Sequence, residues 1–303
     1  MVKRADARYG PSMRLILALL LLIIPATAPA KAPEADIAKP ALWRMSDSDT
    51  TIWLFGSVHV LSPDIRWFEG PVAKAFAKSD ELVVETELSA DAATSRTLLE
   101  RAFDRNGKPL RSELTPKQRT AYDARLSAYG LNLVTFDQFK PWFAATSLTS
   151  IAYRRMGFAS DKGVEMVLFA EARKTGKPIV SLERLEEQVA LLDSFARPVQ
   201  IRMLELTLEE LDEGAEHATK LVDAWRRGDD IALADEMNDS IDVLPELRSV
   251  LLDQRNERFT DWIARRMAKP GVAFVAVGAG HFGGKHNVRE LLEAKGFRIK
   301  RVQ

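Results

Sequence analysis

Residues Val272–Gly284 read VAFVAVGAGHFGG, and the fold can be predicted outward from this stretch. Its first six residues, Val272–Val277, are apolar without a polar break and rich in valine, which is typical of a strand buried on both faces. The glycines Gly278 and Gly280 allow the backbone to turn sharply after the strand. His281 is then the first side chain able to do chemistry. It would lie at the carboxyl end of a buried strand, where open α/β sheets place their sites.

An earlier stretch of the chain follows the same plan. Thr51–Phe55 reads TIWLF, which is typical of a strand, and the sequence GSVH at 56–59 comes directly after it. A lone histidine at such a turn usually bonds a backbone group, but two strands that each end in Gly-x-x-His indicate one shared site for His59 and His281. Glycines beside a histidine let a ligand approach the backbone closely. We therefore expect ligand-binding roles at Gly56, Gly278 and Gly280.

Two further strands each end in a glutamate. Glu81–Thr86 reads ELVVET and follows a helical stretch, which gives a strand-helix-strand unit with Glu85 at its end. Such a connection is expected to place this strand beside the strand of His59, with Glu85 at the same edge of the sheet. Pro178–Leu182 reads PIVSL and is followed by Glu183.

The remaining strands and helices complete an α/β pattern. Leu42–Met45 is expected to form a hairpin with Thr51–Phe55, and Phe297–Val302 is expected to be the last strand. Residues 91–158 and 197–268 have mainly helical patterns. We therefore predict one domain over residues 41–303, with a central, mostly parallel sheet flanked by helices. Residues 91–158 would form a helical cap beside the sheet, and residues 197–268 a second helical insertion.

Three helices are predicted in more detail. Ser160–Thr175 has one apolar face, and Ser160 or Asp161 could cap it. Apolar residues between Leu204 and Trp225 alternate spacings of four and three, which is a heptad seam. Such a seam packs either against a neighbouring helix of the same chain or against a second copy in a homodimer.

The third helix carries a polar pair on an apolar face. Leu244–Met267 is predicted as one long helix, and Arg255 falls on its apolar face with Asn256 beside it. Polar side chains on a buried face need partners. This pair is therefore either a structural clamp or part of a functional site.

Composition excludes several classes of protein. The chain has 303 residues, 46% hydrophobic and 28% charged, with a formal net charge of zero. A neutral chain of this kind is not expected to bind nucleic acid or membrane surfaces through general electrostatic attraction. The sequence has no cysteine, which excludes disulfides, thiolate metal sites and cysteine nucleophiles.

The first thirty residues have the pattern of a secretory signal peptide. Basic residues precede the apolar run Leu15–Ile24, and Ala28-Pro29-Ala30 (28–30) is a small-x-small cleavage site. Residues 31–40 would be a loose tether. We expect a periplasmic or secreted protein without membrane attachment after cleavage. The alternative is an uncleaved N-terminal anchor.

The two histidines and Glu85 have the chemistry of a metal site. Two imidazoles and a carboxylate suit a divalent first-row metal such as Mn, Co or Zn, with positions left for water and substrate. Such a metal would activate water or polarise a carbonyl group. Glu183 and Glu165 are candidates for a supporting or basic role, although a glutamate on a helix is more often a solvated surface residue.

Two other site types are less consistent with the sequence. Gly278-x-Gly280-x-x-Gly283 has dinucleotide-binding spacing, but the acidic residue expected about twenty positions later is absent from the basic final strand. Ser57 lies beside Gly56, but the chain has no Gly-x-Ser-x-Gly elbow, which argues against a serine hydrolase.

With these residues assembled, the chain resembles the TraB/GumN family, which is related to the TIKI metalloproteases. The similarity covers about Leu42–Val302, and its specificity lies in the order of its motifs. These motifs are GSVH at 56–59, LVVET with Glu85, GVE at 163–165, GKP at 176–178, LERLEEQ at 182–188, Arg255-Asn256, and VGAGH at 277–281 followed by Gly284. Glu165 stands where the family usually has aspartate, and Asn287 stands where a glycine is common.

The resemblance implies a fold like that of erythromycin esterase and the haem-binding ChaN proteins. It also implies a metal-dependent hydrolase that acts on a peptide or small-molecule substrate, with peptide bonds as the target in the TIKI branch. In this hypothesis His59, Glu85 and His281 hold the metal or its water, and Glu165 or Glu183 supports them. Arg255 and Asn256 would hold the substrate carbonyl or the carboxylates. The alternative is a non-catalytic protein that binds haem or another ligand through the same histidines.

Overall fold

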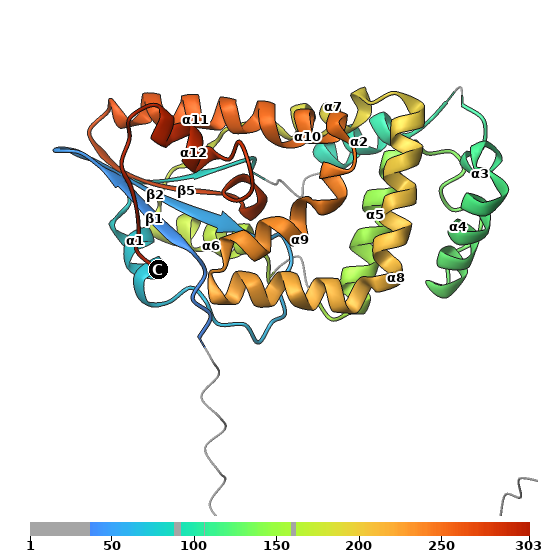
Figure 1. The fold of residues 1–303 in the computed structure, drawn as a ribbon, viewed down its shortest axis with the longest axis horizontal. Helices are drawn as coiled ribbons and strands as arrows, with labels where there is room; N and C mark the ends of the chain where they lie inside the picture. Colours follow the sequence, from blue (N-terminus) through green and yellow to red (C-terminus); the bar gives the residue numbers. More distant parts are fainter. Residues whose placement is uncertain (1–36, 88–91, 106, 159–161) are drawn as a thin grey trace, which may run out of the picture. The chain divides into compact units, whose positions relative to one another are not determined.

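The computed structural model describes residues 37–87, 92–105, 107–158 and 162–303. Within them six strands form one sheet in the order β4-β3-β5-β2-β1-β6, and Figure 1 shows β1, β2 and β5 of this sheet side by side. The strands are β1 (Leu42–Ser46), β2 (Thr50–Ser57), β3 (Glu81–Val84), β4 (Ile179–Ser181), β5 (Gly271–Gly278) and β6 (Ile299–Arg301). The predicted signal peptide and most of the predicted tether lie outside the described residues.

The sheet is mixed, with a parallel centre and an antiparallel edge. β5 pairs in parallel with both β2 and β3, and β4 pairs in parallel with β3. β1 pairs antiparallel with β2, which confirms the predicted hairpin, and β6 pairs antiparallel with β1. The predicted α/β class with a mostly parallel sheet is therefore confirmed.

The prediction that the strand of Glu85 lies beside the strand of His59 is wrong. β2, α1 (Gly70–Lys78) and β3 form the expected strand-helix-strand unit, but β5 lies between β2 and β3. The crossover therefore skips one position of the sheet. β5 enters that position from the far end of the sequence and contacts both strands.

The residues of β5 explain its central position. Phe274 and Ala276 belong to one hydrophobic cluster, and Ala273, Val275 and Val277 belong to another. Because successive side chains of a strand point to opposite faces, β5 contributes to the core on both sides of the sheet. The run Val272–Val277, which has no polar residue, therefore suits a central strand that is covered on both faces.

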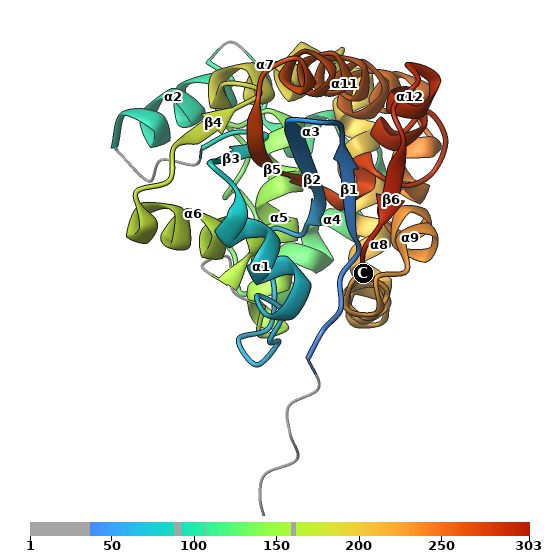
Figure 2. The same cartoon turned by 90° about the vertical axis from the view of Figure 1, so that its left-hand side faces the viewer.

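Helices cover both faces of the sheet. Figure 2 shows α11 (Gln254–Met267) and α12 (Val288–Ala294) over one face, and α1 and α6 (Val164–Thr175) over the other. Their buried residues join the two clusters to which β5 contributes. The other helices are α2 (Ala92–Ala102), α3 (Leu110–Glu113), α4 (Pro116–Ala128), α5 (Pro141–Arg155), α7 (Leu185–Ser194), α8 (Arg197–Arg227), α9 (Asp230–Asp242) and α10 (Pro245–Arg248).

The predicted heptad seam lies on α8. Leu204 and Leu208 of the seam share a hydrophobic cluster with Leu148 of α5. Farther along α8, Val222 and Trp225 join the cluster on the α1 and α6 side of the sheet. Much of the seam therefore packs within the chain.

Helix ends largely follow the sequence signals. Gly176 and Gly228 end α6 and α8 in the left-handed conformation, which glycine adopts without strain. The N-cap of α6 is Gly163, and the predicted caps Ser160 and Asp161 lie outside the described residues. In the part of the chain that the structure describes, no helix has the length and apolarity needed to span a membrane.

The long helix predicted over Leu244–Met267 is interrupted. A π-helical segment, Ser249–Asp253, separates α10 from α11. A π-helical turn shifts the positions that follow it around the helix axis, and such turns are frequent at functional sites. Arg255 and Asn256 follow this segment after one intervening residue, Gln254, and are both buried.

Candidate functional site

The two Gly-x-x-His motifs end adjacent strands. In the parallel pairing of β2 and β5, Gly56 lies opposite Val277, and Ser57 lies opposite Gly278. The prediction that these two strands are neighbours with their carboxyl ends on one side is therefore confirmed. Gly56 is required here for a steric reason, because a Cβ at this position would lie 3.0 Å from the Cβ of Ala279.

Glu85 directly follows β3 and reaches across to the end of β5. The backbone N–H of Gly278 donates to Glu85 Oε1 at 2.5 Å, and a Cβ on Gly278 would lie 2.9 Å from the same oxygen. The backbone N–H of Glu183 donates to the Glu85 carbonyl, so both strand-end glutamates lie at the same edge. Gly278 therefore serves the site by letting a carboxylate approach the backbone.

His281 is buried and held at both ring nitrogens. Nδ1 lies 2.6 Å from Asn256 Oδ1, and Nε2 lies 3.1 Å from Arg255 Nη1. A guanidinium group only donates hydrogen bonds, so Nε2 accepts and Nδ1 carries the proton. Burial lowers the pKa of His281 to about 4. The ring is therefore neutral near pH 7, with its Nε2 lone pair directed at Arg255.

His59 forms a separate pair with Glu165. Its Nδ1 lies 2.9 Å from Glu165 Oε1, and the same oxygen accepts a hydrogen bond of 2.6 Å from Ser57 Oγ. The His59 side chain is 72% exposed, whereas that of Glu165 is 11% exposed. The charge of Glu165 raises the pKa of His59 to about 9. Burial alone would raise the pKa of Glu165, but the charge and hydrogen bond of His59 lower it.

Arg255 joins the two strand-end glutamates. Its Nη2 donates to Glu85 Oε2 at 2.5 Å, and its Nε donates to Glu183 Oε2 at 3.0 Å. Nη1 also donates to the carbonyl of Leu251, which belongs to the π-helical segment, at 3.2 Å. Burial would raise the pKa of Glu85, but Arg255 and then His281 lower it to about 2. Glu85 is thus a carboxylate near pH 7.

Two residues that we did not predict as site residues complete this cluster. Gln188 Nε2 lies between the glutamates, 3.3 Å from Glu85 Oε2 and 3.4 Å from Glu183 Oε2. Arg258 Nη2 donates to Glu183 Oε1 at 2.7 Å. Gln188 is the last residue of the LERLEEQ motif, which could have identified it. Arg258 lies one helical turn after Arg255, and its side chain is 50% exposed. No sequence signal distinguishes it from a surface arginine.

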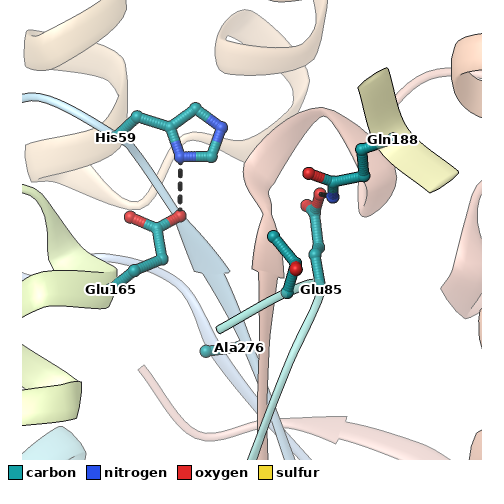
Figure 3. Close-up of a pocket in the computed structure, with 6 residues that line it drawn as sticks. His59, Glu85, Glu165, Gln188 and Ala276 are labelled. Atoms are coloured by element: carbon teal, nitrogen blue, oxygen red, sulfur yellow. Dashed lines mark hydrogen bonds and ion pairs between the residues drawn. The ribbon is translucent and has the colours of Figure 1, made fainter. Parts of the chain in front are cut away.

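A cavity of about 250 Å³ separates the two groups of residues. Figure 3 shows His59 and Glu165 on one side and Glu85 with Gln188 on the other. The described residues that line it are His59, Glu85, Thr86, Glu165, Gln188 and Ala276.

The predicted site residues therefore form two sets. In the first set, Glu183, Arg255 and His281 lie around Glu85, and Asn256 bonds Nδ1 of His281. The second set is the pair of His59 and Glu165. Gly280 lies apart from both sets, where Asn238 of α9 donates to its carbonyl at 3.4 Å.

The donor types of the site, two imidazoles and a carboxylate, are those that a divalent metal takes in proteins. Metal-bound histidines usually donate their second ring N–H to an oxygen, as both His59 and His281 do through Nδ1. Nε2 of each ring is therefore the nitrogen that could coordinate a metal, although Nε2 of His281 now accepts from Arg255 Nη1 at 3.1 Å and lies 3.6 Å from Glu85 Oε1. A proton on His59 Nε2 would have to leave when a metal binds. Within the described residues no three or more histidine, aspartate or glutamate side chains are gathered closely enough to hold an ion.

The comparison with known protein families agrees with this arrangement of motifs. The model of the TraB/PrgY/gumN family matches residues 41–301. The chain belongs to this family. Its motif-bearing strands and helices all lie within the matched range.

Two curated relatives were found by sequence similarity. The Uncharacterized protein YbaP of Escherichia coli (strain K12) is 26% identical over 243 residues, which cover 79% of this chain and 86% of that protein. The Uncharacterized protein YbaP of Shigella flexneri is similar to the same extent. No solved structure matched the chain significantly.

Proposed function

We propose that this protein is an exported metal-dependent hydrolase that cleaves peptide bonds. The observation that carries the proposal is the matched orientation of the two histidines at the end of adjacent strands. Each has its Nδ1 on a side-chain oxygen, at 2.9 Å for His59 and 2.6 Å for His281. Glu85, a carboxylate near pH 7, follows β3 on the other side of β5 and lines the cavity.

The residues of the chain would divide the work as follows. His59, Glu85 and His281 would hold a Mn, Co or Zn ion, which would activate water or polarise the substrate carbonyl. Glu165 keeps the proton of His59 on Nδ1, and Asn256 does the same for His281. Because a metal ligand must present a lone pair in a fixed direction, these two residues would act by orienting the imidazoles.

Glu165 also has a place in proton transfer. It lines the cavity, and its Oε1 already accepts from Ser57 and His59. A buried carboxylate beside an imidazole can accept a proton from an attacking water and pass it to a leaving amine. Glu183, by contrast, is occupied by Arg255 and Arg258, which suits a structural role.

The size of the cavity favours a peptide over haem. Its volume of about 250 Å³ is below the ~300–1,000 Å³ typical of sites that enclose a drug-sized ligand. A peptide group and one flanking side chain would fit, with the rest of the substrate outside. Binding of haem or another ligand without catalysis is the alternative function.

The deciding experiment measures peptide cleavage after metal removal. Protein purified and treated with EDTA is incubated with a peptide library, with and without added Mn²⁺, Co²⁺ or Zn²⁺. We expect cleavage only with metal, and its loss in H59A and in H281A. The matched control is H217A, because His217 also pairs with a glutamate, Glu236, at 3.0 Å but lies on α8.

Three outcomes would count against the proposal. Cleavage that persists in EDTA would exclude a metal-dependent reaction, and equal losses in all three variants would show a general effect on folding. A haem absorption band on reconstitution, without metal-dependent cleavage, would favour the alternative. The H59A/H281A double variant should be no worse than either single variant, because residues that act as one unit are not additive.

A further inference from the structure

The guanidinium group of Arg255 occupies the convergence point of the site's acceptor atoms. Nη2 contacts Glu85 Oε2 at 2.5 Å and Glu183 Oε2 at 2.9 Å, and Nη1 contacts His281 Nε2 at 3.1 Å. The residue is only 8% exposed, so these contacts are shielded from water. Two carboxylates and one imidazole lone pair thus converge on one permanent cation.

Two of these three residues, Glu85 and His281, are among the proposed ligands of the metal. His281 Nδ1 carries the ring proton, so Nε2 has the ring's only lone pair available for coordination. This lone pair can bind either a hydrogen-bond donor or a metal ion, and it now accepts a hydrogen bond from Arg255 Nη1. An arginine cannot give up its charge to make room, and its guanidinium would repel a divalent cation a few ångströms away.

We propose that Arg255 takes the place of the metal in the metal-free protein, so that metal binding requires its guanidinium to leave His281 and Glu85. The inference rests on the proposed metal dependence of the site. It goes further by assigning to one side chain the control of metal affinity.

The structure provides a place for the displaced guanidinium to stay. Nε of Arg255 donates to both oxygens of Glu183, at 3.2 and 3.0 Å. Because Glu183 is not one of the proposed ligands, the planar guanidinium can move as one rigid group away from His281 and Glu85 and remain paired with Glu183. Glu183 is itself fixed by Arg258 at 2.7 Å. The displaced charge therefore remains paired with a carboxylate, which lowers the cost of the movement.

The direction in which metal affinity changes distinguishes a competitor of the metal from one of its ligands. Removing a ligand or a residue that orients a ligand weakens metal binding. Removing Arg255 should instead tighten metal binding and lower the stability of the metal-free protein, because uncompensated buried carboxylates remain. Competition of this kind is reciprocal, as for any two coupled equilibria.

The test compares R255Q with R258Q. Both substitutions remove one positive charge that contacts Glu183, but among the described residues Arg258 contacts neither Glu85 nor His281, and its side chain is 50% exposed. Isothermal titration calorimetry with Mn²⁺ alone is expected to show roughly tenfold tighter binding for R255Q than for the unmodified protein. R258Q should change the affinity by less than about threefold, because an exposed charge is screened by solvent. In EDTA, R255Q should melt at a lower temperature than R258Q.

A measurement on the unmodified protein covers the case in which R255Q does not fold. A crystal structure with Mn²⁺ bound should show Arg255 Nη1 beyond hydrogen-bond distance of His281 Nε2. Mn²⁺ bound while that contact is kept would overturn the inference. So would unchanged or weaker Mn²⁺ binding in R255Q.

The result also separates this inference from the proposed function. Mn²⁺ binding to the unmodified protein without tighter binding in R255Q would overturn the role of Arg255 and leave the metal site in place. Absence of Mn²⁺ binding to the unmodified protein and to R255Q would overturn both.

Discussion

Replacement of Asn256 by alanine tests whether the histidine of β5 is held as the structure shows. Asn256 is 1% exposed and bonds two groups that are distant from it in sequence. Its Oδ1 accepts from His281 Nδ1 at 2.6 Å, and its Nδ2 donates to the carbonyl of His286 at 2.9 Å. Alanine removes both bonds without adding bulk, so the change in stability reports these two contacts.

The two contacts differ in what their loss costs. His281 is 4% exposed, so its Nδ1–H would be left without water, at a cost of ~1–3 kcal/mol for a buried unsatisfied group. His286 is only partly buried, and water can replace Asn256 at its carbonyl, so that loss is ~1 kcal/mol or less. We therefore expect N256A to lower the free energy of unfolding by about 3 kcal/mol.

Urea unfolding at pH 8 in EDTA measures this change without a contribution from bound metal. The matched control is N238A, since Asn238 is also buried and, among the described residues, bonds the same loop through a long contact of 3.4 Å to the Gly280 carbonyl. N238A should cost at most about 1 kcal/mol. A loss in N256A no larger than that in N238A would refute the claim that Asn256 fixes His281.

Three further predictions follow from the same contacts. E165Q should lower the pKa of His59 from about 9 towards ~6.5, because the charge of Glu165 is the main cause of its elevation, and NMR titration of the imidazole would measure this. The metal-free protein should lose on the order of 2–3 kcal/mol of stability as the pH falls from 6.5 to 4. In this range His281 of the unfolded chain binds a proton, whereas folded His281, with a pKa of about 4, does not. Urea unfolding across this range would measure the loss. G56A should cost ~1–3 kcal/mol in a melting experiment, because its Cβ would lie 3.0 Å from that of Ala279.

Each of these predictions has a clear contrary result. A His59 pKa that stays near 9 in E165Q would assign its elevation to another carboxylate, such as Glu85. An acid-side loss of stability that persists unchanged in H281N would show that His281 does not cause it. A melting temperature of G56A equal to that of the unmodified protein would show that the turn after β2 has room for a side chain.

The sequence was sufficient to predict the elements of the fold and the pairing of its two motifs. Apolar runs followed by Gly-x-x-His placed His59 and His281 at neighbouring strand ends, and the structure has these strands paired in parallel. Ser57, Gln188 and Arg258 were not predicted as site residues. Their side chains enter the site through contacts that span between 5 and 108 positions of the chain, and local periodicity carries no information about such contacts.

The polar pair on α11 shows a second limit of periodicity. Counting along one continuous helix from Leu244 placed Arg255 on the buried face but left its role open between a clamp and a site. The π-helical segment Ser249–Asp253 resets the helix phase just before Arg255. Its side chain reaches Glu85, Glu183 and His281 together, so it is both a clamp and part of the site.

The central position of β5 in the sheet, by contrast, could have been inferred from the sequence. A strand without polar residues on either face requires cover on both faces and hydrogen-bonded neighbours on both sides. Val272–Val277 is such a run, whereas Glu81–Val84 begins with a charged residue and is shorter. The central place between β2 and β3 therefore belongs to β5. The end of β5 therefore bonds Glu85, which follows β3 on one side, and lies beside the His59 motif, which follows β2 on the other side. For this reason the last motif in the sequence lies in the middle of the site.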